Sequence, residues 1–337
     1  MHPSSERLMR WKERPVLVTG AGGFIGSHLV EALVKLEAKV RAFVHYNSRN
    51  DPGLLSLLPE EITAEVELVA GDLRDPFSIR QAVDGTSTVF HLGALISIPY
   101  SYINPREVAE TNLMGTLNVL QACREFGVNR LVHTSSSEVY GTAINVPIDE
   151  DHPLQGQSPY SASKIGADKL AESYFLAYGL PVVTARPFNT YGPRQSGRAV
   201  VPTVITQALS KDAIHLGNLD PRRDLTYVSD TVEGFLRTAE TPGIEGRIYN
   251  LGTGSDVSIS ELVQMILHIL GRKVDIVVDD ERMRPERSEV QRLISDNSLA
   301  NEQLGWSPRI SLDEGLRNTI TWISEHMHLY EGEGYRV

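Results

Sequence analysis

The sequence has a single cysteine, and this scarcity excludes two ways of stabilising a fold. Cys123 has no second cysteine with which to form an internal disulfide, and a cysteine-rich metal site is excluded for the same reason. The residue lies in a segment with helical apolar spacing, so we expect it to pack in the core. We expect no metal site.

Long apolar runs are also absent. No run of about 18 apolar residues is present to cross a bilayer, and the first dozen residues lack the apolar segment of a signal peptide. We therefore expect a cytoplasmic protein that does not bind membranes.

Basic residues are in short supply. The chain has 32 Lys and Arg against 43 Asp and Glu, a net charge of -11, which argues against binding to nucleic acids or anionic membranes. Local arginines must therefore hold any anionic ligand. The 337 residues suffice for one large domain, or for two closely joined ones, with a substantial core.

A glycine-rich turn follows the first apolar segment. Pro15–Thr19 is typical of a short strand, GAGGFIG follows at once, and helical spacing of apolar residues comes next. Such a turn lets a pyrophosphate approach bare backbone at a helix N-terminus. The sequence thus predicts a dinucleotide site that includes Gly20, Gly23, Phe24, Ile25 and Gly26.

The second predicted strand, Lys39–Val44, lacks the acid that would bind the ribose 2′-hydroxyl of NAD. His45 and Arg49 follow it instead, and they or Arg41 could contact a 2′-phosphate. The sequence therefore leaves both NAD and NADP open.

Further apolar segments alternate with helical patterns, which predicts an α/β fold: a Rossmann-type, doubly wound parallel sheet of about seven strands. After Arg186 the alternation breaks down, and we expect a smaller, interleaved C-terminal substrate lobe. The predicted boundaries are 13–186 plus 227–252 for the dinucleotide domain, and 187–226 plus 253–337 for the substrate lobe. The remaining strands are predicted at 66–70, 88–92, 131–134, 181–185 and 248–251.

Several residues near the strand ends are candidates for cofactor contacts. Asp72 follows the third strand, where it could meet adenine or cap the next helix. A glycine after the fourth strand lets the backbone run close to a flat cofactor. Asn112 is predicted to point inward from the following helix. The other candidates are Leu73, Leu92, Gly93, Ala94 and Pro187.

The stretch Leu131–Lys164 brings together several reactive side chains. Ser136, Ser137 and Glu138 follow a buried strand, and Ser158 with Pro159 marks the start of a helix. Tyr160 and Lys164 are four residues apart and share one helix face. An ammonium beside a phenol favours the phenolate, so the pair can act as a general base, although such a pair alone also fits a solvated face.

The motifs TGAGGFIG, GDLRD, HTSSSEVYG, PYSASK and RPFNTYGPRQ together resemble the extended short-chain dehydrogenase/reductase family that acts on nucleotide sugars. The resemblance covers essentially the whole chain. The acid before Val-Tyr-Gly resembles that of the 4,6-dehydratases. The segments around PYSASK and TYGPRQ look most similar to the nucleotide-N-acetylhexosamine 4,6-dehydratases of legionaminic-type sugar biosynthesis.

This resemblance implies a role for each catalytic candidate. Tyr160 would take the proton of the sugar 4-hydroxyl while hydride leaves C4 for bound NAD or NADP. Lys164 would lower the pKa of Tyr160 and hold the nicotinamide ribose, and Ser136 would hydrogen bond the 4-oxygen. Glu138 would then remove the C5 proton, water would leave from C6, and the hydride would return to C6.

The chain departs from glucose-type dehydratases at one position. These enzymes resemble each other in an Asp-Glu pair, whereas this chain has Ser137 before Glu138, as mannose-type dehydratases do. Because serine is a poor acid, either Glu138 also serves the leaving 6-hydroxyl or a water molecule helps.

The resemblance also implies contacts with a UDP- or GDP-linked sugar. The diphosphate would be held by Asn189, Arg194, Arg223 and Arg284, with Asn112 as a further substrate residue, and 214–217 would line the base. Surface arginines paired with acids are the alternative for each arginine. The helices predicted at 106–126 and 159–178 have apolar residues on more than one face. This pattern fits a homodimer built on a four-helix bundle, and it also fits ordinary packing within one chain.

The sequence as a whole favours a nucleotide-sugar 4,6-dehydratase acting on an N-acetylhexosamine. A UDP-uronic acid decarboxylase shares Ser-Glu-Val-Tyr-Gly and remains open. A 4-epimerase needs no base at C5, so Glu138 argues against it. A non-catalytic dinucleotide-sensing protein would have no use for the intact set Ser136, Glu138, Tyr160 and Lys164.

Overall fold

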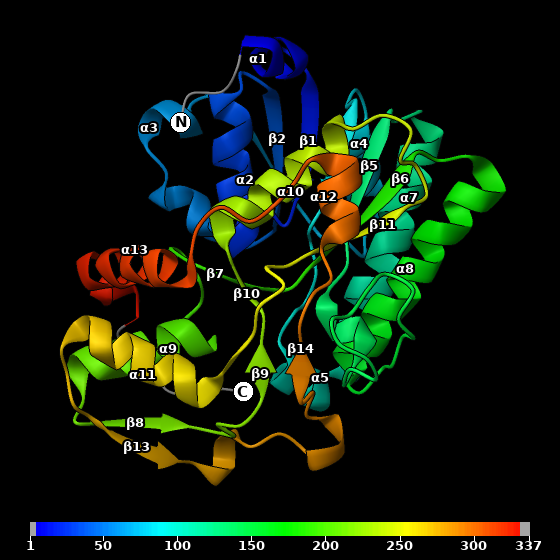
Figure 1. Cartoon of the computed structure of the whole chain (residues 1–337). Helices are drawn as coiled ribbons and strands as arrows, with labels where there is room; N and C mark the ends of the chain where they lie inside the picture. Colours follow the sequence, from blue (N-terminus) through cyan, green and yellow to red (C-terminus); the bar gives the residue numbers. More distant parts are fainter. Residues whose placement is uncertain (1–4, 331–337) are drawn as a thin grey trace.

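Seven parallel strands form the central sheet, in the order β3-β2-β1-β4-β5-β6-β11. The structure is a computed structural model and describes residues 5–330, so 1–4 and the last part of the predicted substrate lobe, 331–337, lie outside it (Figure 1). All seven predicted segments are strands of this sheet, which confirms the Rossmann-type fold. The strands are β1 Pro15–Thr19, β2 Lys39–His45, β3 Val66–Gly71, β4 Thr88–His91, β5 Arg130–Thr134, β6 Val182–Pro187 and β11 Ile248–Leu251.

Helices cover both faces of the sheet because successive strand residues point to opposite sides. Val16 and Val18 lie in one apolar cluster, whereas Leu17 between them lies in another. The first cluster is covered by α1 Ser5–Trp11, α2 Phe24–Lys35, α3 Glu60–Thr63, α10 Val228–Glu240 and α12 Ser298–Leu304. The second is covered by α4 Pro76–Val83, α7 Gly115–Glu125 and α8 Pro159–Tyr178.

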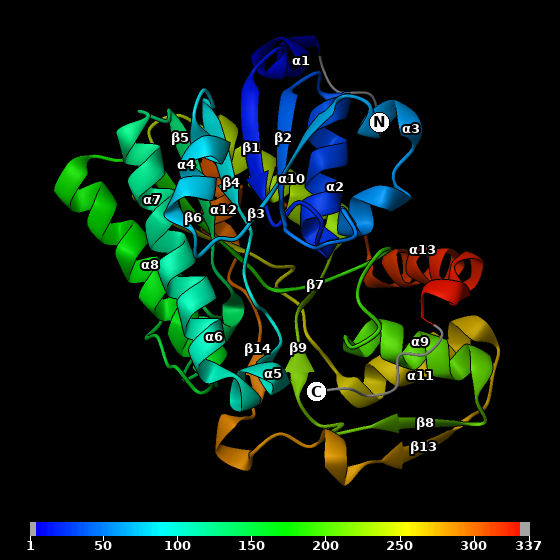
Figure 2. The ribbon, with the colours of Figure 1, turned by 180° about the vertical axis from the view of Figure 1, so that it is seen from behind.

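A smaller lobe with its own apolar core lies below the carboxyl ends of the sheet strands (Figure 2). Its helices are α9 Val200–Ser210, α11 Ile259–Leu270 and α13 Leu312–Glu325, and its parallel pair is β8 Ala213–Leu216 with β13 Asp275–Val278. Short strands lie between this lobe and the sheet: β7 Asn189–Tyr191, β9 Arg222–Arg223, β10 Leu225–Tyr227, β12 Val257–Ser258 and β14 Arg292–Leu293. The described residues also form the helices α5 Ile98–Ile103 and α6 Pro105–Ala109. Their short turns are η1 Gly53–Leu57, η2 Glu110–Met114, η3 Ser137–Tyr140, η4 Asp280–Arg282, η5 Glu286–Ser288 and η6 Met327–Leu329.

The predicted boundary of the substrate lobe differs from the structure around α12. Leu304 and Trp306 are buried in the cluster on the sheet, not in the core of the lobe. The indole of Trp306 donates a hydrogen bond to the carbonyl oxygen of Asp230 in α10 at 2.9 Å. The segment 298–306 therefore returns to the dinucleotide domain, although the sequence boundaries place it in the lobe.

The helix predicted at 106–126 is divided in the structure. It begins as α6 Pro105–Ala109, passes through the π-helical turn η2, and continues as α7. Asn112 lies in this turn, and π-helical turns within helices are frequent at functional sites. Within residues 5–330, no helix is long and apolar enough to cross a membrane. The same residues contain no group of three or more His, Cys, Asp or Glu side chains that could hold a metal ion.

Candidate active site

The glycine-rich turn between β1 and α2 fits a dinucleotide pyrophosphate. Gly20 has a φ of 69°, and a Cβ there would lie 2.8 Å from the Cα of Gly93. A Cβ on Gly26 would lie 2.2 Å from the carbonyl oxygen of Gly20. The N-cap residue Gly23 provides no side-chain cap, and no acid occupies the first turn of α2. The first N–H groups of α2 are therefore available to an anion.

The other predicted cofactor residues lie around this turn. Phe24 and Ile25 begin α2, Leu92 and Ala94 follow β4, and all four are half-buried. Leu73 is half-buried too, and its Cδ1 lies 2.8 Å from the position that a Cβ on Gly93 would take. Pro187 is buried at the end of β6.

The loop after β2 is shaped by the amide of Asn47. Its Oδ1 accepts hydrogen bonds from the backbone N–H of Arg49 at 3.1 Å and of Asp51 at 3.0 Å, and its Nδ2 donates to the carbonyl oxygen of Asp51 at 2.8 Å. His45 and Arg49 are exposed at this end of the strand. They remain the candidates for contact with a ribose or its phosphate.

Two charged residues near this end have other uses. Arg41 donates to Glu67 at 2.9 Å and also to three backbone carbonyls, so it is not free for a 2′-phosphate. Asp72 does not cap the next helix, because Asp75 accepts from the first turn of α4. Hydrogen bonding from Arg74 lowers the pKa of Asp72, which is therefore ionised and paired.

The catalytic candidates come from the exit of β5 and the start of α8. The hydroxyl of Ser136 caps η3 by accepting from the N–H of Glu138 at 3.2 Å, and it also hydrogen bonds with the phenol of Tyr160. The predicted start of α8 is confirmed, since Ser158 caps it in a capping box. Tyr160 thereby lies in the first turn, facing the strand exit.

Lys164 lies one turn further along α8 and donates to the carbonyl oxygen of Thr134 at 2.6 Å. Burial lowers the pKa of this lysine to about 8. Burial raises the pKa of Tyr160 to about 12, the Ser136 hydrogen bond opposes this, and the charge of Glu138 adds to it. Desolvation therefore dominates the pKa of Tyr160 in the protein alone, and the lowering of this pKa by Lys164 stays a prediction.

Two of the predicted arginines converge on one carboxylate. The guanidinium of Arg223 lies 3.2 Å from Oε1 of Glu289, and that of Arg284 lies 3.4 Å from the same oxygen. Burial lowers the pKa of Arg223, and the charge of Glu138 is the largest opposing influence. Glu138 thus lies within electrostatic reach of both Tyr160 and Arg223.

Asn189 also fits a polar ligand. It is half-buried in β7, beside Leu225 of β10, and its buried Oδ1 has no hydrogen-bond partner. An unpaired buried amide oxygen is costly, so a ligand donor would stabilise it. Ser137, which stands where glucose-type dehydratases have an aspartic acid, is buried, with 2% of its surface exposed.

Arg194 does not join Arg223 and Arg284. Its guanidinium donates to Glu31 at 2.7 Å and to Nδ1 of His28 at 2.5 Å, and both partners lie on α2. These contacts tie the loop after β7 to the helix after the glycine turn. The buried Nη1 of Arg194 has no hydrogen-bond partner, so its contact with a diphosphate stays a prediction.

Asn112 is also engaged by the protein. It is 1% exposed, accepts from the N–H of Leu95 at 2.8 Å, and donates to the carbonyl of Leu95 at 3.0 Å and to Ser163 at 2.9 Å. It positions the loop after β4, and its contact with a substrate stays a prediction. In the segment 214–217, which is predicted to line the base, the side chains of Ile214 and Leu216 are buried in the core of the lobe.

Sequence reasoning missed two residues. Glu289 lies five positions after Arg284, in a segment without helical or strand periodicity, and nothing in the pattern marks it. Asp168 lies four positions after Lys164 on α8, and that spacing could have identified it. Its carboxylate accepts hydrogen bonds from Ser135, directly after β5, and from Arg186 in β6.

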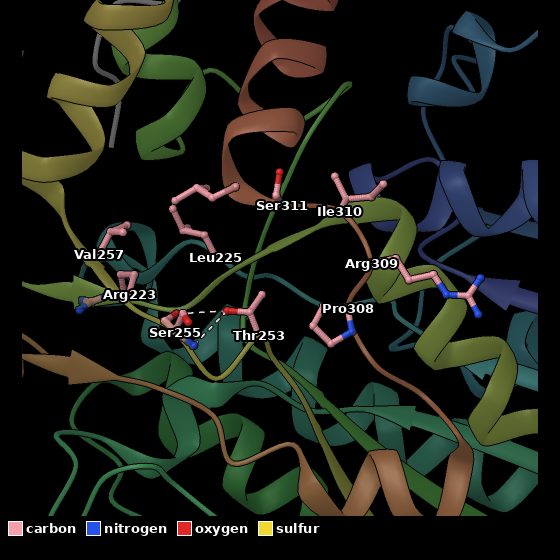
Figure 3. Close-up of a pocket in the computed structure, with 10 residues that line it drawn as sticks. Arg223, Leu225, Thr253, Ser255, Val257, Pro308, Arg309, Ile310 and Ser311 are labelled. Atoms are coloured by element: carbon pink, nitrogen blue, oxygen red, sulfur yellow. Dashed lines mark hydrogen bonds between the residues drawn. The ribbon is translucent and has the colours of Figure 1, made fainter.

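A surface cavity of about 380 Å³ lies between β10, the loop after β11 and the start of α13 (Figure 3). Thr253 and Ser255 hydrogen bond to one another at its edge. Its lining shares Arg223 with the site but contains neither Tyr160 nor Glu138, so it is not the catalytic centre. The lining residues are Arg223, Leu225, Thr253, Ser255, Val257, Pro308, Arg309, Ile310, Ser311 and Leu312.

Comparison with known proteins agrees with this geometry. The family model described as GDP-mannose 4,6 dehydratase matches residues 17–319. The dTDP-glucose 4,6-dehydratase of Streptomyces griseus is 32% identical over 94% of this chain and 96% of its own. The UDP-glucose 4-epimerase of Mycolicibacterium smegmatis is 34% identical over 90% of this chain and 96% of its own.

A solved relative has the same fold with a bound cofactor. DesIV, a dTDP-glucose 4,6-dehydratase from Streptomyces venezuelae solved with NAD, superposes with a TM-score of 0.82 at 29% identity, covering 94% of this chain and 98% of that one. The family match spans well over half of the chain and includes every catalytic candidate. The chain therefore belongs to the GDP-mannose 4,6-dehydratase family, among dehydratases and epimerases that act on nucleotide sugars.

Proposed function

We propose that this protein is a nucleotide-sugar 4,6-dehydratase that uses NAD or NADP and acts on a nucleotide-linked N-acetylhexosamine. The observation that carries the proposal is the position of Glu138. Its charge acts on both Tyr160 and Arg223, so a carboxylate lies within electrostatic reach of the group that would take the 4-hydroxyl proton and of one group that would hold the diphosphate. A base in that position is what elimination across C5 and C6 needs.

The cofactor site is supplied by the glycine turn and by the uncapped N-terminus of α2. When bound, an oxidised nicotinamide supplies a hydride acceptor for C4, returns the hydride at C6, and brings a positive charge that lowers the pKa of a neighbouring phenol. Relatives solved with NAD support this assignment. The end of β2, with exposed His45 and Arg49, leaves room for either NAD or NADP.

The protein residues move protons around this hydride transfer. Tyr160 accepts the proton of the 4-hydroxyl, with Ser136 hydrogen bonding to the same centre. Once C4 is a ketone the C5 proton is acidic, and Glu138 removes it. Ser137 is buried and a poor acid, so Glu138 delivers this proton to the leaving 6-hydroxyl, directly or through a water molecule. When the hydride returns at C6, C5 takes up a proton, which balances the one that Tyr160 removed from the 4-hydroxyl.

The diphosphate is held by the arginine pair and Asn189. A guanidinium can pair two oxygens at once, which suits a diphosphate. Arg223 and Arg284 already meet at Glu289, and the unpaired Oδ1 of Asn189 can accept from a ribose hydroxyl. UDP and GDP both fit this chemistry.

A 4-epimerase is the second candidate, because several relatives are named as epimerases. Such a reaction uses Tyr160 and Lys164 but leaves Glu138 without a role. A UDP-uronic acid decarboxylase is the third, since it also begins with oxidation at C4. We also propose a homodimer formed through η2, α7 and α8, where Met114 of η2 and Leu176 and Tyr178 of α8 are exposed.

A substrate panel read by mass spectrometry, and by NMR for the configuration at C4, separates these functions. The protein with NAD or NADP is incubated with UDP- and GDP-N-acetylglucosamine and with UDP-glucuronic acid. We expect the loss of one water from an N-acetylhexosamine nucleotide. Loss of carbon dioxide from the uronic acid, or inversion at C4 without mass change, would replace the proposal with the corresponding alternative.

A further inference from the structure

A buried carboxylate lies beneath the catalytic residues. Asp168 is 4% exposed and accepts four hydrogen bonds, from β5, from the residue that follows β5 and from β6, where Arg186 donates two of them. Nε2 of His133 lies 3.0 Å from Oδ1, while Oγ of Ser135 at 2.7 Å and Nη2 of Arg186 at 2.9 Å share Oδ2. The carboxylate thus joins α8 to β5 and β6.

These contacts continue those of the catalytic pair. Tyr160, Lys164 and Asp168 follow one another at intervals of four residues, so they lie along one face of α8. They meet consecutive residues at the exit of β5: the phenol meets Ser136, the ammonium meets the carbonyl of Thr134, and the carboxylate meets Ser135. Asp168 is therefore part of the contact that sets the strand exit against the helix.

Asp168 is also the group whose charge favours protonated Lys164. Burial would raise the pKa of Asp168, but the His133 hydrogen bond and the charge of Arg186 outweigh it and bring the pKa to about 2. Burial lowers the pKa of Lys164 to about 8, and the charge of Asp168 opposes this effect.

Other groups around the lysine do not replace Asp168. Burial lowers the pKa of His91 on β4 and of His133 on β5, so both imidazoles are neutral and supply no negative charge. Arg186 on β6 is a cation, and Tyr160 on α8 is a neutral phenol at neutral pH. Glu138 on η3 acts on Tyr160 and Arg223.

We propose that Asp168 is a positioning residue for the hydride-transfer step: it keeps Lys164 protonated, and it fixes the strand exit that carries Ser136 and Glu138 against the helix that carries Tyr160. The inference rests on the proposed function for its effect on turnover. The link between the carboxylate and the lysine can be measured without turnover.

The test compares Asp168→Asn with Ser135→Ala in the full-length protein with its cofactor. Asp168→Asn removes the charge, so kcat falls roughly tenfold to a hundredfold, as for misplaced catalytic groups, while KM changes little. Activity that needs the ammonium is lost as the pH rises through the pKa of Lys164, and this alkaline limb moves to lower pH in Asp168→Asn. Ser135→Ala removes one hydrogen bond but no charge, so its alkaline limb stays with the wild type.

NMR titration of lysines labelled with ¹³C at Cε measures the same link in the protein alone, with Lys164→Arg identifying the signal. The Lys164 signal is expected to titrate near pH 8 in the wild type and lower in Asp168→Asn. If Asp168→Asn does not fold, Asp168→Ser carries the same test, because it also removes the charge that raises the lysine pKa. An unchanged titration and alkaline limb in the folded variant that lacks this charge overturns the inference. A wild type inactive on every substrate would instead overturn the proposed function, and the titration would still decide the role of Asp168.

Discussion

Replacement of Arg223 by Gln should weaken the binding of a nucleoside diphosphate without unfolding the protein. The side chain is 8% exposed and contacts Glu289, which keeps Arg284 as a second partner after the change. A hydrogen bond to a charged group contributes about 1.5–3 kcal/mol. Because each 1.4 kcal/mol is about tenfold in affinity, the Kd should rise by roughly ten- to 150-fold.

The neighbouring residue in the same strand provides a matched control. Arg222 is 36% exposed and pairs at 3.1 Å with Asp256 and with Glu261. Surface pairs of this kind contribute about 0–1 kcal/mol. Arg222→Gln removes the same charge from β9 but leaves the contacts of Arg223, so the Kd should stay close to that of the wild type.

Isothermal titration calorimetry with UDP and with GDP measures both variants against the wild type. The nucleotide that binds wild type more tightly also identifies the base that the lobe accepts. The assignment of Arg223 to the diphosphate would be refuted if Arg223→Gln bound this nucleotide as the wild type does, or if Arg222→Gln lost as much affinity.

Three further variants test other parts of the site. Tyr160→Phe removes the proton acceptor at C4, so turnover should fall about 100- to 10,000-fold while the cofactor still binds; full activity would mean that the phenol is not the base. Glu138→Gln should still reduce the bound cofactor on addition of substrate, seen as nicotinamide absorbance, but should release no dehydrated product; normal product release would exclude Glu138 as the C5 base. The third variant concerns His28, because burial and the charge of Arg194 lower its pKa to about 4, below its ordinary value. As the pH falls, the imidazole is therefore protonated first in the unfolded chain. The folded state loses stability between about pH 6.5 and pH 4. The free energy of unfolding should fall by at most about 3 kcal/mol over this range. Denaturant unfolding of His28→Gln should not show this fall, and an equal fall in that variant would contradict the prediction.

The sheet could be predicted from the sequence because its signals are local. Each strand is a short apolar run, and Ser158 with Pro159 gives both the cap and the first residue of α8. The pairing of Tyr160 with Ser136 follows once strand exit and helix start meet at the same edge of the sheet. These features depend on neighbours in the chain and on known rules of topology.

The differences come from contacts between distant segments. Arg194 meets Glu31 across 163 positions of the chain, and Glu289 meets Arg223 across 66. No periodicity encodes such partners. The pKa of Tyr160 depends on the depth of burial, and the spacing of Tyr160 and Lys164 gives no measure of that depth. The return of 298–306 to the sheet likewise depends on a pocket for Trp306 between distant helices.

The most direct test of the central claim follows one labelled hydrogen. The protein is incubated with its active nucleotide sugar carrying deuterium at C4, and the product is examined by NMR. Oxidation at C4, elimination assisted by Glu138 and return of the hydride predict a 4-keto product with the deuterium at C6. Deuterium recovered at C4 of an inverted sugar, with the 6-hydroxyl intact, would contradict the account and show an epimerase.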